Sequence, residues 1–247
     1  MPPGMMTRSM DIPLIITSAI NVNAPRTKLG GISDRLHHTL EGLREWVTLR
    51  AFRRIIVCDG SGFDIAPYLK QLDESGDAGL TFESLCFQND ISLVAQRGKG
   101  YGEGQIVQHT LNHSRLLADA DSFAKCTSKL WVTNAAECVR HYNGTAALNL
   151  SGGFSPKYVD TRFYIFSKAF YASHLSDCHR TVDEDHGYFL EHRFLESIKD
   201  TRMYRNTLYP TPTIRGVSGS MGTPYQTSRR NNLMKDFRNT VLCFAGY

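Results

Sequence analysis

The fold class follows from residues 12–20, which read Ile12-Pro13-Leu14-Ile15-Ile16-Thr17-Ser18-Ala19-Ile20. This run is apolar without polar alternation, as expected of a strand covered on both faces. Further strands are predicted at 54–62, 80–87, 123–132 and 159–167, and stretches with helical periodicity separate them up to residue 132. Strand–helix alternation predicts an α/β domain with a mixed, mostly parallel sheet covered by helices. Ligands bind outside the carboxyl ends of the strands in such a sheet.

The composition is that of one ordinary globular domain. The chain has 247 residues, of which 41% are hydrophobic and 21% are charged. Lys and Arg number 28 against 24 Asp and Glu, which gives a net charge of +4. This mild, scattered excess suits a phosphate-bearing ligand or an anionic membrane surface and falls short of a nucleic-acid footprint. No apolar run approaches the ~18–20 residues that span a bilayer, so we expect a cytoplasmic chain or one at the inner face of the membrane.

Two functional halves are expected within this single domain. Residues 12–134 form the predicted nucleotide-binding half, and residues 135–247 add the acceptor side to the same unit. Within the second half, residues 209–230 are rich in Pro, Gly, Ser and Thr, which predicts a lid-like loop. In the first half, Ser33 is expected to cap a helix, which places Arg35 beside the loop that follows the first strand.

A glycine-rich stretch precedes a helical pattern in the first half. It reads Arg97-Gly98-Lys99-Gly100-Tyr101-Gly102-Glu103-Gly104. Such a loop at a helix start offers backbone N–H groups to a phosphate, and Lys99 and Gly100 are the candidate contacts. The pattern of a P-loop is absent, which argues against P-loop NTPases. A flexible turn is the alternative.

Polar side chains on one face of a predicted strand form a second phosphate candidate. Strand alternation over residues 123–132 places Lys125, Thr127 and Lys129 on the same side. They could bind a diphosphate, and solvent-facing lysines on an edge strand are the alternative. The lid-like loop supplies three further candidates for phosphate contact, Ser218, Gly219 and Ser220. A disordered linker is the alternative for this loop.

Two charged residues near strand ends are further candidates. Asp59 ends the second strand before Gly60, where a carboxylate can accept a hydrogen bond from a base or a ribose hydroxyl. We expect it to face a ligand and not to hold the core, with a turn Asp as the alternative. Arg162 opens a later strand and could contact the donor, although an internal ion pair with Asp160 is favoured.

Acidic and imidazole side chains gather over residues 181–192 at the predicted start of a helix. Glu191 is the first candidate for a general base, followed by Asp183 and Glu184. Glu184 and Glu191 are seven residues apart and would share a helix face near Gly187, whose missing side chain leaves room for a substrate. The alternative is a cluster of acids that the helix dipole favours.

Metal ligands are weakly indicated. Asp119 and Asp121 could chelate Mg²⁺ or Mn²⁺, but they follow a helix and precede the strand, so a solvated loop is the alternative. The six cysteines include no CxxC pair, and reduced thiols are expected. Zinc binding by two Cys/His pairs is the minor alternative: Cys138 with His141, and Cys178 with His179.

The order of these pieces resembles the GT-A class of glycosyltransferases, particularly small bacterial and viral sugar transferases of surface polysaccharide pathways. The likeness covers most of residues 12–200 and rests on these segments: 15–20, the helix of Arg35, 56–62, 97–104, 123–134, 159–167 and 183–191. The resemblance implies that Ser18, Ala19 and Asp59 hold the nucleoside and that Lys99 lies near the donor. The strand expected to end in Asp-x-Asp reads Lys125-Cys126-Thr127-Ser128-Lys129 instead. Lys and Thr groups would then replace a metal beside the diphosphate.

These features predict a glycosyltransferase that moves a sugar from a nucleotide-sugar donor to a saccharide or lipid-linked saccharide. Cell-surface polysaccharide synthesis, as of lipopolysaccharide or capsule, is the expected setting. A carboxylate would take the acceptor proton while cations stabilise the departing phosphate. No cofactor is expected, with Mn²⁺ or Mg²⁺ as the alternative. A sugar-phosphate nucleotidyltransferase and a non-catalytic nucleotide- or saccharide-binding module remain open as other functions.

Overall fold

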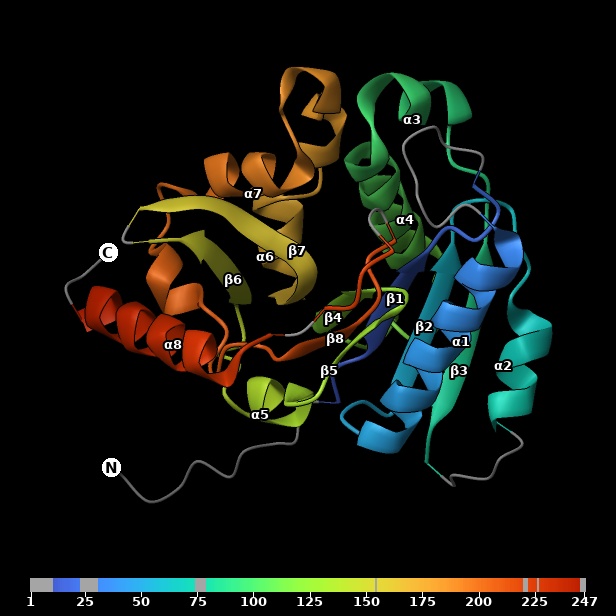
Figure 1. Cartoon of the computed structure of the whole chain (residues 1–247), viewed down its shortest axis with the longest axis horizontal. Coiled ribbons are helices and arrows are strands. Elements are labelled where there is room, and N and C mark those ends of the chain that lie inside the picture. Colours follow the sequence, from blue (N-terminus) through green and yellow to red (C-terminus); the bar gives the residue numbers. More distant parts are fainter. Residues whose placement is uncertain are drawn as a thin grey trace.

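A six-stranded sheet runs through the centre of the protein (Figure 1). The computed structural model describes residues 11–22, 31–73, 79–153, 155–219, 222–225 and 227–244. The strands of the sheet are β1 (Leu14–Ser18), β2 (Arg54–Asp59), β3 (Thr81–Cys86), β4 (Ser122–Thr127), β6 (Ala146–Gly152) and β7 (Pro156–Ser167). Their order is β3-β2-β1-β4-β7-β6; the first four are parallel, and β7 is antiparallel to both of its neighbours. The predicted α/β class with a mixed, mostly parallel sheet is confirmed.

Helices cover both faces of this sheet. They are α1 (Ile32–Leu49), α2 (Ala66–Asp73), α3 (Ile91–Arg97), α4 (Lys99–His113), α5 (Ala135–Arg140), α6 (Lys168–His174), α7 (Leu190–Ile198) and α8 (Arg229–Phe244), with short 3-10 turns η1 (Cys178–Thr181), η2 (Glu184–His186) and η3 (Met203–Asn206). The core on one face includes Trp46 of α1 and Leu69 of α2, and the core on the other includes Val107 of α4 and Phe194 of α7. None of the helices in the described ranges combines the length and hydropathy needed to cross a bilayer.

The first strand is buried on both sides, as its sequence predicts. All five residues of β1 are buried, and Ile15 and Ile16 belong to the two opposite cores. In this sheet β1 pairs with β2 on one side and with β4 on the other. The chain proceeds from β1 through β2 to β3 on one side and then returns to place β4 on the other side of β1. The boundary between β1 and β4 is therefore the point of the sheet where a ligand crevice is expected.

The predicted strand 123–132 is two strands. β4 ends at Thr127, and the chain turns at Lys129, whose φ is 72°. Beyond the turn, β5 (Leu130–Val132) pairs with β8 (Ile214–Gly216) in a separate two-stranded sheet. The expected common face of Lys125, Thr127 and Lys129 is thus wrong at Lys129. The segment 209–230, expected to be a lid-like loop, contains β8 and the first residues of α8.

The glycine-rich stretch is a helix, not a loop. Gly98, with a φ of 104°, joins α3 to α4, and the remaining glycines lie in the first two turns of α4. A Cβ at Gly100 would stand 2.8 Å from the Cβ of Leu190, and one at Gly104 would overlap the Cβ of His179. These glycines therefore permit close packing of α4 against α7 and η1.

Two helix starts also differ from the prediction. Gly31 is the N-cap of α1, and the helix begins at Ile32, so Ser33 lies inside the first turn and does not cap it. The predicted helix start over residues 181–192 is divided, because Gly187 adopts a φ of 82° and ends η2 before α7 begins at Leu190. Glu184 and Glu191 therefore lie on separate elements and share no helix face.

We expect Gly104→Ala to destabilise the protein by about 1–3 kcal/mol, because the added methyl group overlaps His179 at an atom that cannot rotate away. The matched control is Gly42→Ala in α1, where the nearest atoms would stand at an ordinary 3.5 Å. That change should stabilise the helix by about 0.5–1 kcal/mol. Urea unfolding of both variants measures the difference, and equal effects would contradict the packing role.

Candidate functional site

Asp59, the last residue of β2, is fully buried and bound within the protein. Its Oδ1 accepts hydrogen bonds from the backbone N–H of Ser61 at 2.8 Å and from the Ser61 hydroxyl at 2.5 Å. Its Oδ2 accepts from the N–H of Ile20 at 3.0 Å. The carboxylate thus ties the end of β1 to the end of β2. The expectation that Asp59 faces a ligand and does not hold the core is wrong, because both of its oxygens are engaged internally.

Two buried cations lie at the boundary between the ends of β1 and β4. The Nε of Arg35 donates to the carbonyl of Ala19 at 2.8 Å, just beyond β1. Lys129 lies in the turn after β4, with its Nζ 3.3 Å from the Ser128 hydroxyl. Burial and the neighbouring charge of Arg35 lower the pKa of Lys129 to about 7, against the opposing attraction of Asp59. Within the described residues, no carboxylate oxygen lies within ion-pairing distance of Lys129.

Two hydroxyl groups near the end of β1 are unpartnered. Thr17 and Ser18 are buried, and among the described residues neither hydroxyl has a hydrogen-bond partner. Successive side chains of a strand point to opposite faces of the sheet, so Ser18 lies on the face covered by α1 and Thr17 on the face covered by α4. Buried hydroxyls are normally bonded, so the Ser18 hydroxyl, on the face of the helix that carries Arg35, is suited to a polar ligand. We call Ser18, Arg35 and Lys129 the strand-end site.

Lys125 on β4 is not available to a diphosphate. It is fully buried, and its Nζ contacts Glu103 at 2.5 Å, the Thr127 hydroxyl at 2.9 Å and the carbonyl of Thr161 at 2.9 Å. An ammonium has three protons to donate, so all are used. The alternative of a solvent-facing lysine on an edge strand is equally wrong, because β4 is central. Thr127 likewise serves Lys125 and not a ligand.

Glu191 stands next to this ion pair, in the first turn of α7. It accepts a hydrogen bond from the Thr161 hydroxyl at 3.1 Å. Burial, and secondarily the charge of Glu103, raise the pKa of Glu191 above its ordinary value, while Thr161 and Lys125 oppose the shift. Two carboxylates therefore flank one ammonium. Sequence reasoning did not single out Glu103, whose only signal was being an acid within a closely packed, glycine-rich helix start.

Glu184 and Asp183 are occupied elsewhere. Glu184 accepts a hydrogen bond from the N–H of Gly100 at 2.8 Å, at the amino end of α4. The site expected to hold a phosphate through Lys99 and Gly100 is thus filled by a carboxylate of the chain itself. Asp183 is paired with His186, with 2.8 Å between Oδ2 and Nδ1. Of the three predicted bases, only Glu191 lies close enough to Glu103 and Lys125 for their charges to affect its pKa.

Of the remaining candidates for contact with the donor, one is paired within the protein and another lies beside the strand-end site. Arg162 is paired with Asp160, with Nη2 2.5 Å and Nε 2.8 Å from its two oxygens, so the internal ion pair is confirmed. Gly219 lies against the strand-end site, because a Cβ there would stand 3.1 Å from the Cε of Lys129. Ser218 donates its N–H to Thr223 at 2.9 Å in the same turn. Ser220 lies outside the described residues.

The strand-end site does not suit a divalent metal. Its charged members are cations, and the nearby carboxylate of Asp59 is already bonded. Asp119 lies at the opposite edge of the sheet, bonded to Arg54 at 2.6 Å, an interaction that lowers its pKa. The fallback metal pair of Asp119 and Asp121 is therefore remote from Asp59.

One potential metal group occurs in the described part of the chain. It consists of His37, His38 and Glu41 on α1, whose ligand atoms lie within 4.8 Å of one another. His37 is exposed, and the Nδ1 of His38 is already 3.0 Å from Glu41. Within the same ranges, the Cys138/His141 and Cys178/His179 pairs belong to no group of three ligands, and all six cysteines are free.

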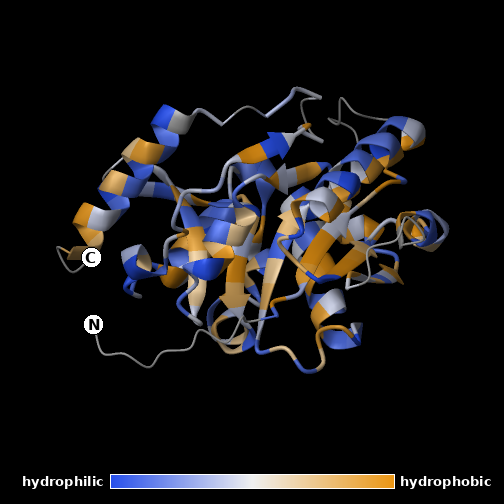
Figure 2. Cartoon of the chain, turned by 90° about the horizontal axis from the view of Figure 1, so that it is seen from below, coloured by the Kyte–Doolittle hydropathy of each residue, from blue (hydrophilic) through white to orange (hydrophobic). Residues whose placement is uncertain are grey.

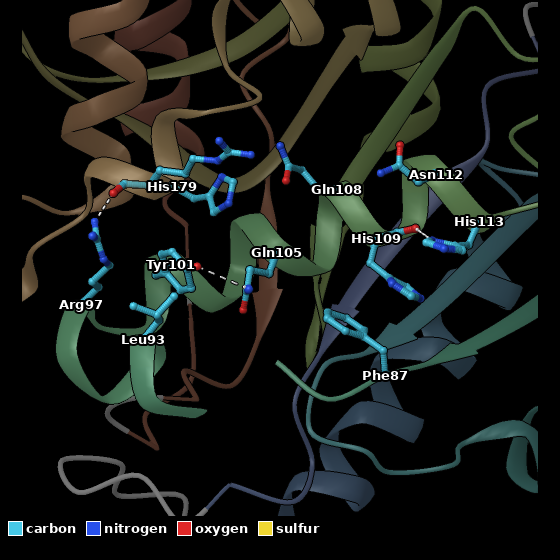
Figure 3. A pocket seen from close by; sticks show the side chains of 11 residues that line it. Phe87, Leu93, Arg97, Tyr101, Gln105, Gln108, His109, Asn112, His113 and His179 are labelled. Atoms are coloured by element: carbon cyan, nitrogen blue, oxygen red, sulfur yellow. Dashed lines mark hydrogen bonds between the residues drawn. The ribbon is translucent and has the colours of Figure 1, made fainter. Parts of the chain in front are cut away.

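An open groove of about 510 Å³ lies between α3, α4 and η1 (Figure 3). Its lining includes Arg97 of α3 together with Tyr101, Gln105 and His109, which lie on the side of α4 away from Glu103. The ring of His109 stacks on Phe87 with 4.1 Å between centroids, and burial lowers the pKa of His109. Amide and aromatic side chains of this kind contact saccharide hydroxyls and rings. Sequence reasoning did not anticipate this groove, because its residues come from distant segments.

Comparison with known proteins gives likeness to solved structures alone. No family model and no curated protein matches the chain. A protein named as a nucleotide-diphospho-sugar transferase from Desulfovibrio desulfuricans is 11% identical with a TM-score of 0.44, over 78% of this chain and 77% of that chain. One named as a glucose-1-phosphate thymidylyltransferase from Bacillus anthracis, bound to sucrose, is 11% identical with a TM-score of 0.45, over 92% and 95%. The 4-diphosphocytidyl-2C-methyl-D-erythritol synthase of Anaerococcus prevotii is 10% identical with a TM-score of 0.40, over 93% and 98%.

We expect Asp59→Ala to lower the free energy of unfolding by about 3 kcal/mol or more, because it leaves the buried N–H of Ser61 without an acceptor and removes one of the two acceptors of the Ile20 N–H. Urea unfolding measures this loss. Asp121→Ala is the control, since Asp121 is exposed at the opposite edge of the sheet. Unchanged stability of the Asp59 variant would show that the carboxylate does not hold the two strand ends.

Proposed function

We propose that the protein is a glycosyltransferase that binds the diphosphate of a nucleotide-sugar donor at the strand-end site. One observation carries the proposal. Arg35 and Lys129 bring two buried positive charges to the boundary between the ends of β1 and β4, near the unpartnered hydroxyl of Ser18. A diphosphate would offset the repulsion between the cations and accept a hydrogen bond from the hydroxyl. The position also agrees with the general rule for ligands of open α/β sheets.

Glu191 is the proposed general base. Its raised pKa makes it a stronger base than an ordinary glutamate, and the hydrogen bond from Thr161 orients it. In the proposed reaction Glu191 takes the proton of an acceptor hydroxyl while that oxygen bonds to the anomeric carbon of the sugar. The nucleoside diphosphate leaves with the electrons of the broken C–O bond, and Arg35 and Lys129 neutralise its charge. The ion pair of Glu103 with Lys125 fixes the surroundings of Glu191.

Two further elements of the proposal concern the acceptor and the setting of the reaction. The acceptor that we propose is a saccharide, free or lipid-linked. Cell-surface polysaccharide synthesis on the cytoplasmic side of a membrane is the setting that we propose. A non-catalytic nucleotide- or saccharide-binding module would use the same cations without turnover.

A sugar-phosphate nucleotidyltransferase is the second candidate function. Its chemistry brings together two phosphate-bearing substrates, for which carboxylates that hold a divalent metal are the usual device. Here the carboxylate at the end of β2 is bonded to Ile20 and Ser61, and the turn after β4 carries the buried cation Lys129. These observations favour transfer of the sugar over transfer of the nucleotide.

We expect Glu191→Gln to reduce turnover by roughly 10²–10⁴-fold, because it keeps the shape and removes the proton acceptor. The measurement is release of nucleoside diphosphate from a panel of nucleotide sugars. Burial raises the pKa of Glu191, so its ionised form is disfavoured on folding and its contribution to stability is lost as pH rises through that pKa. The Gln variant should therefore unfold at an equal or higher temperature at pH 7.

The matched control is Glu196→Gln on the same helix, an exposed residue that pairs with Arg193 at 2.8 Å. It should leave turnover unchanged. In the unmodified enzyme kcat/KM should fall on the acid side at a pH above the ordinary glutamate value of 4.5. Full activity of Glu191→Gln would remove this residue from the reaction, and activity lost together with stability would make its role structural.

We expect a nucleoside diphosphate to bind in the presence of EDTA, because cations of the chain occupy the place of a metal. Lys129→Met should weaken binding about tenfold or more, whereas Lys157→Met, an exposed lysine, should not. Since the pKa of free Lys129 is about 7 and an anion would raise it, affinity should fall as pH rises above about 7. Calorimetric titration measures these effects. Binding only with Mn²⁺, and lost in Asp119→Ala, would contradict this expectation.

A further inference from the structure

Helix α8 turns several polar side chains toward the protein and most of its large apolar side chains outward, while Leu242 and Cys243 make its apolar contacts with the core. The inward face is attached by polar contacts: Asp236 accepts hydrogen bonds from the N–H and the hydroxyl of Thr211, at 2.7 and 2.6 Å. Arg238 donates to the carbonyls of Leu150 and Gly152. A surface helix normally buries its apolar side. The reversal in α8 therefore calls for a physical explanation outside the described chain.

The outward face is a continuous apolar stripe. At about 100° of rotation per residue, its members fall within an arc of about 100° along the whole helix. Their exposed fractions are 61% for Leu233, 65% for Met234, 74% for Phe237, 42% for Val241 and 89% for Phe244. Figure 2 shows α8 at the rim of the molecule, with hydrophobic residues recurring along it. Scattered exposed apolar residues are ordinary, but a contiguous stripe marks an interaction surface.

The charges of α8 indicate what this stripe contacts. The helix contains four basic residues, Arg229, Arg230, Lys235 and Arg238, against the single acid Asp236, which is bonded to Thr211. Arg230 is exposed and falls within the arc of the stripe, at its amino end. A second copy of the chain would bring two basic helices together, which is unfavourable. An anionic lipid surface would complement both the charge and the apolar side chains.

We propose that α8 binds the surface of an anionic lipid bilayer, with its apolar stripe inserted below the headgroups and Arg230 among the phosphates. The helix lies along the interface and does not cross it. Its inward face is bonded to Thr211, ahead of β8 and the turn at Gly219 that contacts Lys129. Binding would thus hold the strand-end site at a fixed height above the bilayer. This proposal rests on α8 alone and does not require the proposed function.

Cosedimentation of the full chain with vesicles tests the proposal. We expect binding to vesicles of equal parts phosphatidylglycerol and phosphatidylcholine, and much weaker binding to phosphatidylcholine alone. The double variant Met234→Ser/Phe237→Ser should bind at least about tenfold more weakly, because it removes two large inserted side chains. Arg230→Glu should weaken binding to the anionic vesicles by about fivefold or more.

Matched controls separate the stripe from general effects of the substitutions. Ile91→Ser removes an apolar residue that is 68% exposed on α3, and Arg44→Glu reverses an exposed charge on α1. Both should bind vesicles like the unmodified chain. Equal binding by the double variant would overturn the proposal. Absence of vesicle binding, with a concentration-dependent dimer in sedimentation velocity that the double variant abolishes, would overturn it in favour of a second copy.

Discussion

The carboxylate of Asp59 is the interaction on which the arrangement of the site depends. A buried carboxylate with unpaired oxygens would be strongly unfavourable, so its position is set by the donors that surround it. Those donors come from Ile20 and Ser61, in the loops after two different strands. By joining these loops, Asp59 fixes where β1 ends and hence where the carbonyl of Ala19 meets Arg35. The same negative charge is the attraction that partly offsets the burial of Lys129.

The buried polar groups form two clusters, one around Lys125 and one at the strand-end site. They differ in how many of their hydrogen-bonding groups have partners. Around Lys125 every donor has an acceptor, and Glu103 neutralises the charge. At the strand-end site, the Nζ of Lys129 lies 3.3 Å from one hydroxyl, and in the described residues the Ser18 hydroxyl has no partner. A complete network holds a structure in place, whereas an incomplete one of like charge favours a ligand of the opposite charge. This contrast distinguishes Lys125, whose three donors are all used within the protein, from Lys129, although sequence alternation had grouped the two together.

The sequence predicted the central strands well, because a run such as Leu14–Ser18 is apolar on both faces and has few other places in a folded chain. It failed where one residue changes the direction of the chain. Lys129 adopts a positive φ although it is not glycine, so nothing in its residue type marked the end of β4. Gly98 and Gly187 do adopt positive φ, but the neighbouring glycines of α4 serve packing instead, and composition alone does not distinguish the two uses. Such turns decide which side chains come together. The turn at Gly187 separates Glu184 from Glu191, and of the predicted acids only Glu191 lies near Lys125.

The two-stranded sheet of β5 and β8 has a consequence for the order in which the protein assembles. Its strands join residues 130–132 to residues 214–216, and the carbonyl of Lys129 is held by the N–H of Val217 at 3.1 Å. Closing a loop of this length carries a large entropic cost, which local contacts must offset first. The parallel strands β1 to β4 need no residue beyond 127. During synthesis the four parallel strands are therefore expected to form before the turn at Lys129 is locked, so the nascent amino-terminal half would carry these strands while the surroundings of Lys129 are still incomplete.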